Sequence, residues 1–274
     1  MSVTAGVLIF AHGEKYLRLA TIARAYISQH LNLPVTLITS ETVTNFLKDW
    51  HKIIQVDKPA HNTSPHGIKE WYNRDRLRAY ELSPYELTYV IDADITLHSD
   101  SLAWPHQYCH SEQPDWFLTQ GLVDAFTGDA VGAEVLGTTK IPMRYASIML
   151  FYKYNSAPLF ELAQHIEKNW RFYAEWYGFD PRHYRNDIAF TIADWTLNGK
   201  TSGPALPPLS CIGDTTRVVS MMTFDGVSFT NVLDMLSKNK PHTIIDKTNL
   251  HWVAKDVLLD YMPKPFVYYV PDIM

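Results

Sequence analysis

Short apolar runs alternate with helical patterns along the first third of the chain. Runs of mainly apolar residues, with lengths typical of buried strands, occur at 6–11, 35–39, 53–56 and 86–91. Apolar spacing predicts a long helix at 15–31, and shorter helices are expected at 42–47, capped by Ser40, and at 73–82, before Pro84. Strands that alternate with helices predict an α/β fold, in which helices wrap a mostly parallel sheet.

The second half of the chain has a less regular pattern. Strands are expected at 116–119 and 145–152, and helices at 157–177 and 184–197, the latter closed by Gly199 as a C-terminal cap. Segments rich in glycine, proline, asparagine or threonine predict loops at 57–68, 124–140 and 202–213. Neither a repeat nor a domain linker is evident, so we expect a single domain.

Composition narrows the class of protein. Hydrophobic residues make up 46% of the chain and charged residues 19%, below the usual ~25%, so a sizeable core is available. The net charge of −5 excludes a strongly basic nucleic-acid-binding surface overall, although a local basic groove remains open. Two cysteines, Cys109 and Cys211, make no disulfide framework. The apolar run near the start is too short for a signal or membrane helix, so we expect a soluble cytoplasmic protein without membrane insertion.

Two carboxylates follow the strand expected at 86–91. Asp92 and Asp94 form the only Asp-x-Asp of the sequence. The carboxyl ends of strands in open α/β sheets bind ligands, and residues two apart on an extended chain point to the same side. The pair could therefore hold one hard divalent cation and leave coordination sites open for phosphate oxygens. The alternative is an ordinary turn after a strand, which also favours aspartate.

The turn after the first strand lacks the usual phosphate-binding motifs. Its sequence, Ala11-His12-Gly13-Glu14, contains a single glycine and matches neither a dinucleotide fingerprint nor a Walker loop. If a nucleotide binds this sheet, a metal must neutralise much of its phosphate charge, which gives Asp92 and Asp94 more weight.

Several motifs occur in order over most of the chain. They are Trp71-x-Asn73-x-x-Arg76, Ala79-Tyr80-x-Leu82-Ser83-Pro84-Tyr85, Asp92-Ala93-Asp94, Tyr184-Arg185-Asn186-Asp187-x-Ala189-Phe190-x-Ile192-Ala193 and His251-x-x-x-Lys255. Together they resemble the GT-A-fold glycosyltransferases, whose Asp-x-Asp motif binds a divalent metal that carries a nucleotide-sugar diphosphate. The combination is most similar to glycosyltransferase-like proteins encoded by tailed bacteriophages.

The resemblance implies a GT-A-like, Rossmann-like sheet with a mixed C-terminal part. Residues 1–100 would be the nucleotide-binding half and 101–274 the acceptor-binding half. The implied activity is metal-dependent transfer of a sugar from a nucleotide-sugar to a hydroxyl acceptor. A UDP-sugar is the donor that the resemblance implies, with Mn²⁺ or Mg²⁺ as cofactor. The phage-like resemblance suggests a hydroxylated or hydroxymethylated pyrimidine in DNA as acceptor, in the host cytoplasm, although the acidic charge balance counts against duplex binding. One alternative is the same activity on a polysaccharide, lipid-linked or protein acceptor. The other is a non-catalytic nucleotide-sugar-binding or structural subunit.

The resemblance also implies roles for individual residues. His251 would be the third metal ligand beside Asp92 and Asp94, with its imidazole favouring Mn²⁺, and Lys255 would approach a phosphate. Asp92 could instead reach the ribose, and His251 could be an ordinary, partly buried histidine. The residues expected to contact the donor are Phe10, Ala11, His12, Ser40, Asn73, Arg76, Ala93 and Arg144, the last of which could also meet the acceptor. For each of them a structural role is the alternative.

Asn186 and Asp187 open the helix expected near 184–197. A carboxylate in the first turn of a helix meets the positive end of the helix dipole, so a purely structural role is one possibility. The functional alternative places Asp187 on the acceptor side. There it would be the general base of an inverting enzyme, or it would stabilise the oxocarbenium or act as nucleophile in a retaining enzyme.

Aromatic residues are frequent between 170 and 184, and basic residues lie among them. Such a segment could stack on a nucleic acid strand or on sugar rings, or it could pack its aromatic rings into the core.

Overall fold

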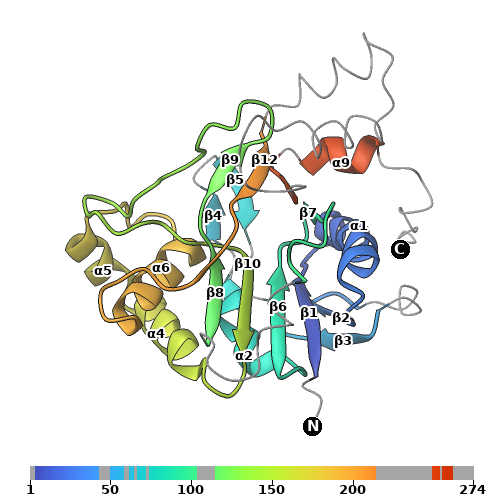
Figure 1. Cartoon of the computed structure of the whole chain (residues 1–274), viewed down its shortest axis with the longest axis horizontal. Coiled ribbons are helices and arrows are strands. Elements are labelled where there is room, and N and C mark those ends of the chain that lie inside the picture. The colour runs from blue at the N-terminus through green and yellow to red at the C-terminus, as the bar shows by residue number, and fades with distance from the viewer. Residues whose placement is uncertain are drawn as a thin grey trace.

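Among the residues that the computed structural model describes, seven strands form a central mixed sheet (Figure 1). The described residues are 4–42, 50–58, 62–64, 67–71, 74–103, 115–213, 249–253 and 255–261. The strand order is β11-β8-β10-β6-β1-β2-β3. The bounds are β1 Ala5–Phe10, β2 Val35–Thr39, β3 Lys52–Gln55, β6 Leu87–Ile91, β8 Trp116–Thr119, β10 Tyr145–Tyr152 and β11 Ala205–Leu206.

The strands β3, β2, β1 and β6 are parallel, and β10 runs antiparallel to β6 and to β8. Val7 of β1 is in register with Val35 of β2 and with Tyr89 of β6. The carboxyl ends of these strands therefore meet at one edge of the sheet. This edge brings residues 10–12, residue 40 and residue 92 into one region of the molecule.

Helices cover both faces of the sheet. Leu8 belongs to one buried cluster, whereas its neighbours Val7 and Ile9 belong to the other, as the alternation of side chains along a strand requires. Helix α1 (Glu14–Leu31) packs in the cluster of Val7 and Ile9, and helices α4 (Ala157–Lys168) and α6 (Asn186–Leu197) pack in the cluster of Leu8. Strands β2 and β6 are buried at every position, which explains their continuous apolar runs.

A second sheet of four described strands, in the order β7-β13-β12-β9, lies beyond this edge. The strands are β7 Ile95–Thr96, β9 Leu122–Asp124, β12 Leu209–Ile212 and β13 Leu250–Trp252. β13 is antiparallel to β7 and parallel to β12. The register pairs His251 with Ile95, so β13 is fixed directly beside the segment that follows β6.

The remaining described elements are short. They are the hairpin strands β4 (Asn62–Ser64) and β5 (Gly67–Trp71), the 3-10 helix η1 (Arg74–Arg78), and the helices α2 (Ala79–Leu82), α5 (Trp170–Tyr177) and α9 (Lys255–Tyr261). Within the part of the chain that the structure describes, no helix has the length and apolar character needed to cross a bilayer.

The predicted order of strands and helices is confirmed, with corrections to individual elements. The helix expected at 157–177 is two helices that meet at Asn169. The backbone of this residue leaves the helical region (φ −110°, ψ 32°), and its side-chain Nδ2 donates to the carbonyl of His165 at 2.9 Å. The helix expected from residue 184 begins at Asn186, and the one expected at 73–82 is η1 followed by α2.

Two segments expected to be loops contain short strands. Residues 57–68 include β4 and the start of β5, and residues 202–213 include β11 and β12. These strands are short and gain their order from pairing with partners distant in sequence, which local composition does not reveal. Gly199 follows α6 with φ of 68°, in agreement with its expected capping role. The helix expected at 42–47 falls almost wholly outside the described residues.

Candidate metal centre

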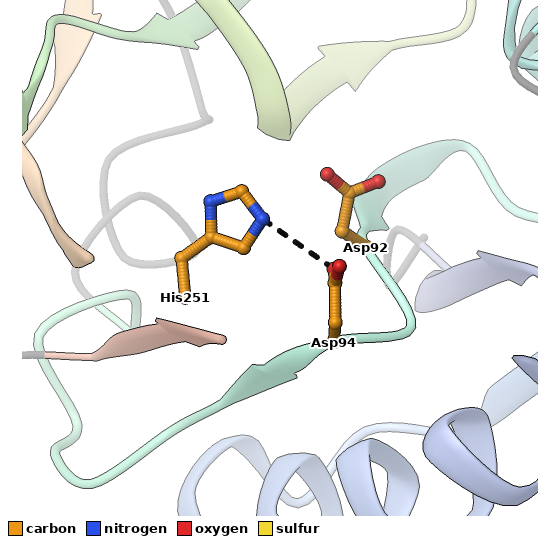
Figure 2. A group of neighbouring side chains, drawn as sticks. All are labelled: Asp92, Asp94 and His251. Carbon is orange, nitrogen blue, oxygen red and sulfur yellow. Dashed lines mark ion pairs between the residues drawn. The ribbon is translucent and has the colours of Figure 1, made fainter. Parts of the chain in front are cut away.

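Asp92, Asp94 and His251 converge at the carboxyl edge of the central sheet. Each of the three offers one ligand atom, and these atoms all lie within 4.8 Å of one another. Figure 2 shows the three side chains beside one another, and the ring of His251 faces Asp94, with Nε2 at 3.5 Å from Oδ1. Carboxylate oxygens and a neutral imidazole are suitable ligands for Mn²⁺, and with water for Mg²⁺, so the residues present fit a divalent cation.

The backbone around residues 92–94 makes this convergence possible. The Ile95 N–H donates to the Asp92 carbonyl at 3.2 Å, so the chain turns after β6 instead of continuing as an extended strand. The Trp252 N–H donates to the Asp94 carbonyl at 2.9 Å, which fixes β13 beside this turn. The two carboxylates therefore come together through a tight turn, and not through the extended geometry expected from the sequence.

The charge of Asp94 is compensated within the protein. Its side chain is buried and contacts the Lys255 Nζ as well as the imidazole of His251. Burial by itself raises the pKa of Asp94, but the positive charges of Lys255 and His251 outweigh it and hold this pKa well below its ordinary value. Burial likewise lowers the pKa of His251, but the Asp94 carboxylate reverses the effect and raises it to about 9. Without a cation, His251 is therefore protonated at neutral pH.

Asp92 is paired with Arg76, which also contacts strand β10. The guanidinium of Arg76 contacts Asp92 Oδ1, and its Nη1 donates to the Ala146 carbonyl at 3.0 Å. The N–H of Ala146 donates to Asp187 Oδ1 at 2.9 Å. Arg76 therefore lies between the Asp-x-Asp turn and Ala146 of β10, whose N–H binds the Asp187 carboxylate of α6.

The Asp187 carboxylate is bound on both of its oxygens. Oδ1 accepts from Ala146, and Oδ2 accepts from Arg185 Nη2 at 2.9 Å. Both partners lie outside α6. The Asp187 carboxylate therefore does not cap the first turn of its own helix by hydrogen bonds. Asn186 is buried, and its Oδ1 accepts from the Tyr184 hydroxyl at 2.9 Å. Asp187 thus lies at the positive end of the helix dipole and also close to the charge of Arg76.

His12 and Ser40 lie together where β1 and β2 end. His12 Nδ1 is 3.0 Å from Ser40 Oγ and accepts from the Ser40 N–H at 3.2 Å. The other ring nitrogen, Nε2, is 3.3 Å from Asp75 Oδ2, and both side chains are nearly inaccessible to solvent. Hydrogen bonding to Nδ1 and the carboxylate at Nε2 fix the ring orientation of His12. No motif or spacing in the sequence singles out Asp75.

Other expected donor residues occupy different environments. Ala11 and Ala93 are buried in the core, and Phe10 is partly buried against it. Asn73 lies outside the described residues. Phe10 is the last residue of β1 and Ala11 follows it, so both lie at the carboxyl edge of the sheet, next to His12 in the chain.

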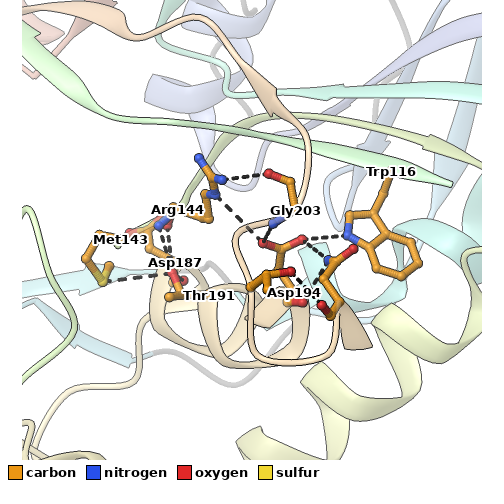
Figure 3. Close-up of polar contacts among 9 residues, drawn as sticks. Trp116, Met143, Arg144, Asp187, Thr191, Asp194 and Gly203 are labelled. Atoms are coloured by element: carbon orange, nitrogen blue, oxygen red, sulfur yellow. Dashed lines mark hydrogen bonds and ion pairs between the residues drawn. The ribbon is translucent and has the colours of Figure 1, made fainter. Parts of the chain in front are cut away.

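Arg144 belongs to a buried polar network beneath α6 (Figure 3). Its Nη2 donates to the Gly203 carbonyl at 2.7 Å, and its Nε is 3.7 Å from Asp194 Oδ2. Asp194 Oδ1 also accepts from Trp116 Nε1 at 2.8 Å. Through these contacts Arg144 fixes the segment that leads into β11. Its expected contact with the donor or the acceptor stays a prediction.

Three further residues surround the site without having been expected there. Arg185 binds Asp187, the Lys255 Nζ lies 5.4 Å from the centre of the Tyr16 ring, and Cys211 Sγ is 3.8 Å from His251 Nδ1. Arg185 stands in one of the motifs quoted above, directly before Asn186, which could have marked it. Tyr16 and Cys211 carry no signal in the sequence, because each reaches the site only through long-range pairing of strands and helices.

Solved structures share this fold, although no protein-family model and no curated protein matches the chain. An active-site mutant of LgtC matches with a TM-score of 0.53 and 14% identity, over 97% of this chain and 98% of that one. The galactosyltransferase LgtC in complex with donor and acceptor sugar analogues matches with a TM-score of 0.52 and 14% identity, over the same shares. Mouse xyloside xylosyltransferase 1, in its apo form, matches with a TM-score of 0.49 and 11% identity, over 90% of this chain and 97% of that one.

The likeness to LgtC shows the fold. The chain has the GT-A-type α/β architecture that the resemblance implied, with the Asp-x-Asp turn at the carboxyl edge of the sheet. The resemblance to bacteriophage-encoded proteins stays a prediction.

Proposed function

We propose that this protein is a metal-dependent glycosyltransferase that moves a sugar from a nucleoside diphosphate sugar to a hydroxyl acceptor. The convergence of Asp92, Asp94 and His251 in a GT-A-type fold carries the proposal. These three residues would hold Mn²⁺ or Mg²⁺. When bound, such a cation supplies positive charge that offsets the charge developing on the departing diphosphate.

Two basic side chains beside the metal centre suit a diphosphate. Lys255 and Arg76 neutralise Asp94 and Asp92 in the structure described here. Once a cation is held by the two carboxylates, these side chains are released to bind phosphate oxygens. Arg76 can do so through its guanidinium and Lys255 as a point charge. The surroundings of the Asp-x-Asp turn are therefore complementary to a doubly charged anionic leaving group.

The nucleoside is assigned to the ends of β1 and β2. His12 is held in one orientation by Asp75 and Ser40. Ser40 Oγ is within 3.3 Å of Glu41 Oε1, so hydroxyl and carboxylate groups accompany the imidazole. This set can hydrogen bond to a ribose and a nucleobase, and we assign uridine as the base from the family resemblance.

Asp187 is assigned to the acceptor side. Arg185 and the Ala146 N–H hold its carboxylate on α6, across Arg76 from Asp92. In an inverting reaction this carboxylate would remove the proton of the acceptor hydroxyl; in a retaining reaction it would stabilise the oxocarbenium-like centre. Asn186 orients the start of the helix through its bond to Tyr184.

Calorimetry with UDP, with and without Mn²⁺, tests the donor side. We expect binding that depends on the metal and that is lost in Asp94→Asn. The matched control is Asp129→Asn, which removes an exposed carboxylate and should bind like the wild type. Equal UDP affinity with and without Mn²⁺ would refute the proposal.

Nucleoside and glycan mass spectrometry tests the acceptor. UDP-glucose and UDP-galactose are incubated with DNA that contains 5-hydroxymethylcytosine, with oligosaccharides and with a peptide acceptor. Transfer to DNA would support the modified-pyrimidine hypothesis, and transfer to a saccharide would support the polysaccharide alternative. Metal-dependent UDP binding without transfer or donor hydrolysis would indicate the non-catalytic alternative.

A further inference from the structure

Helix α5 divides its aromatic residues into a buried and an exposed set. Trp170, Tyr173 and Tyr177 pack against the core cluster that underlies α4 and α6. Phe172 and Trp176, in contrast, are 60% and 73% exposed. The helix is anchored by the first set, so the second is not needed to attach it to the protein. Large exposed aromatic residues that are gathered together mark a binding surface more often than scattered ones do.

The two exposed rings form one continuous surface. Phe172 and Trp176 are one helical turn apart, so they lie on the same face of α5. Their ring centres are 6.1 Å apart and their planes differ by 25°, which is a stacked arrangement. Glu175 joins them to line a hollow of about 530 Å³. The hollow is open to solvent, so it suits a ligand that lies on the surface of the helix and not one that is enclosed.

We propose that this surface, the α5 platform of Phe172, Glu175 and Trp176, binds a neutral sugar ring of a saccharide chain. A pyranose has one face of C–H groups, which bear slight positive charge and pack on the negative face of an aromatic ring. Its edge carries hydroxyl groups, which can donate to the Glu175 carboxylate in charge-assisted hydrogen bonds. The platform offers both kinds of contact side by side.

The carboxylate discriminates against the other ligands that aromatic residues attract. A nucleic acid strand or an anionic lipid headgroup would bring phosphate against Glu175, although Lys168 and Arg171 are exposed on the same stretch of chain. Those two basic residues do not line the hollow. An apolar protein surface would bury the Glu175 charge without a hydrogen-bond partner, which is costly. A neutral polyhydroxylated ring avoids both penalties.

The α5 platform is separate from the metal centre. In Figure 1, α5 lies at one end of the molecule, whereas β7 and α9 lie toward the other. Binding at the platform therefore requires neither cation nor nucleotide, and it goes beyond the proposed function without resting on it. A saccharide bound there would be held to the protein independently of the transfer reaction.

Native gel electrophoresis through hydroxyethyl cellulose, dextran or galactomannan tests the proposal. The full chain is used in EDTA, and oligosaccharides of the retarding polymer are then titrated by tryptophan fluorescence. We expect at least one neutral polymer to retard the wild type. Trp176→Ala and Phe172→Ala should each weaken that binding at least tenfold, and Glu175→Gln several-fold. Tyr154→Ala, which removes another highly exposed aromatic ring, is the matched control and should bind normally. Asp94→Asn should also bind normally, which separates this test from that of the transferase function.

Three results would overturn the proposal. The first is the absence of retardation by every neutral polymer, and the second is equal retardation of wild type and Trp176→Ala. The third is evidence for a different occupant while no polymer binds. Such evidence would be a dimer seen by sedimentation, or binding to phosphatidylglycerol vesicles seen by co-sedimentation, that Trp176→Ala abolishes. Because both rings are exposed, the variants should keep the thermal unfolding midpoint of the wild type, which checks that lost binding is not lost folding.

Discussion

The ammonium of Lys255 contacts the carboxylate of Asp94, although 161 positions separate the two residues in the chain. The same carboxylate lies beside the imidazole of His251. A carboxylate that is to bind a metal is thus already surrounded by positive charge. Binding of a cation at this centre must displace or neutralise that charge, and this requirement leads to several measurable effects.

Metal binding should release a proton. His251 has a pKa raised to about 9 by Asp94, but only the neutral imidazole can ligate a metal. Below pH 9 we therefore expect Mn²⁺ affinity to rise about tenfold per pH unit, with release of roughly one proton per ion at pH 7. Calorimetry in buffers of different ionisation enthalpy measures that proton. His251→Gln is the control, and a wild type that releases no more protons than this variant would contradict the assignment.

Removal of Lys255 should affect the metal and the nucleotide in opposite directions. In Lys255→Met, the Asp94 carboxylate loses a competing cation, so Mn²⁺ alone should bind several-fold more tightly. UDP in the presence of Mn²⁺ should bind about tenfold more weakly, because one charged hydrogen bond to phosphate is worth roughly 1.5–3 kcal/mol. Separate titrations of the two ligands check this. Loss of both affinities together would show that Lys255 supports only the fold of the site.

The stability of the metal-free protein should depend on pH through the same pair. The pKa of His251 is higher in the folded state than its ordinary value of 6.5. Its contribution to stability is therefore complete below pH 6.5 and disappears as the pH rises through 9, by an amount on the order of 3 kcal/mol. Asp94 has a lowered pKa, so its contribution exists above its ordinary pKa of 3.8 and is lost in acid.

Thermal unfolding in EDTA between pH 6 and 10 measures the His251 contribution. In His251→Gln the decline in this range should be much smaller than in the wild type. An equal decline in both proteins would assign the effect to other groups.

The Arg144–Asp194 pair should stabilise the fold far more than an exposed pair does. Both side chains are buried, so Arg144→Ala leaves an uncompensated charge and should cost about 3–5 kcal/mol in the free energy of unfolding. The exposed pair of Arg182 and Asp180 is the control, for which Arg182→Ala should cost at most about 1 kcal/mol. Urea unfolding measures both changes. Equal costs would show that the buried network in Figure 3 is not a structural anchor.

Asp187→Asn should separate binding from turnover. Its carboxylate is bound to Arg185 and Ala146 and does not contact the metal ligands directly. We expect metal-dependent UDP affinity to change little, while transfer falls about 10²-fold or more, as is usual when a general base is removed. If Asp187→Asn transfers sugar at the wild-type rate, the role of Asp187 is only structural, at the start of α6.

The elements of the fold that the sequence predicts well are those with a strong local pattern. The buried strands β1, β2 and β6 are apolar runs, and α1 shows helical spacing over its length. The place of Asp92 and Asp94 at the carboxyl end of β6 follows from such a run, whereas the tight turn that brings their carboxylates together does not. The division between α4 and α5 is not predictable in this way, because it depends on how the Asn169 side chain competes for one carbonyl.

The candidate site is predictable only in part. Asp92 and Asp94 are suggested by their spacing, but His251 was selected from twelve histidines by family resemblance alone. Asp75, Tyr16 and Cys211 had no such guide, since their roles arise from contacts between elements distant in sequence. Arg144 looked available to a ligand, and only the tertiary structure reveals its contacts with Asp194 and Gly203.

A single alanine of β10 connects Arg76 and Asp187 through its backbone. The carbonyl of Ala146 is held by Arg76 and its N–H by Asp187. If Arg76 exchanges its carboxylate partner for a phosphate, the pull on Ala146 would change, and the change would reach the Asp187 carboxylate through the backbone N–H of the same residue. Donor loading and acceptor alignment would then be coordinated by the backbone of one small residue, whose own side chain contributes nothing to either.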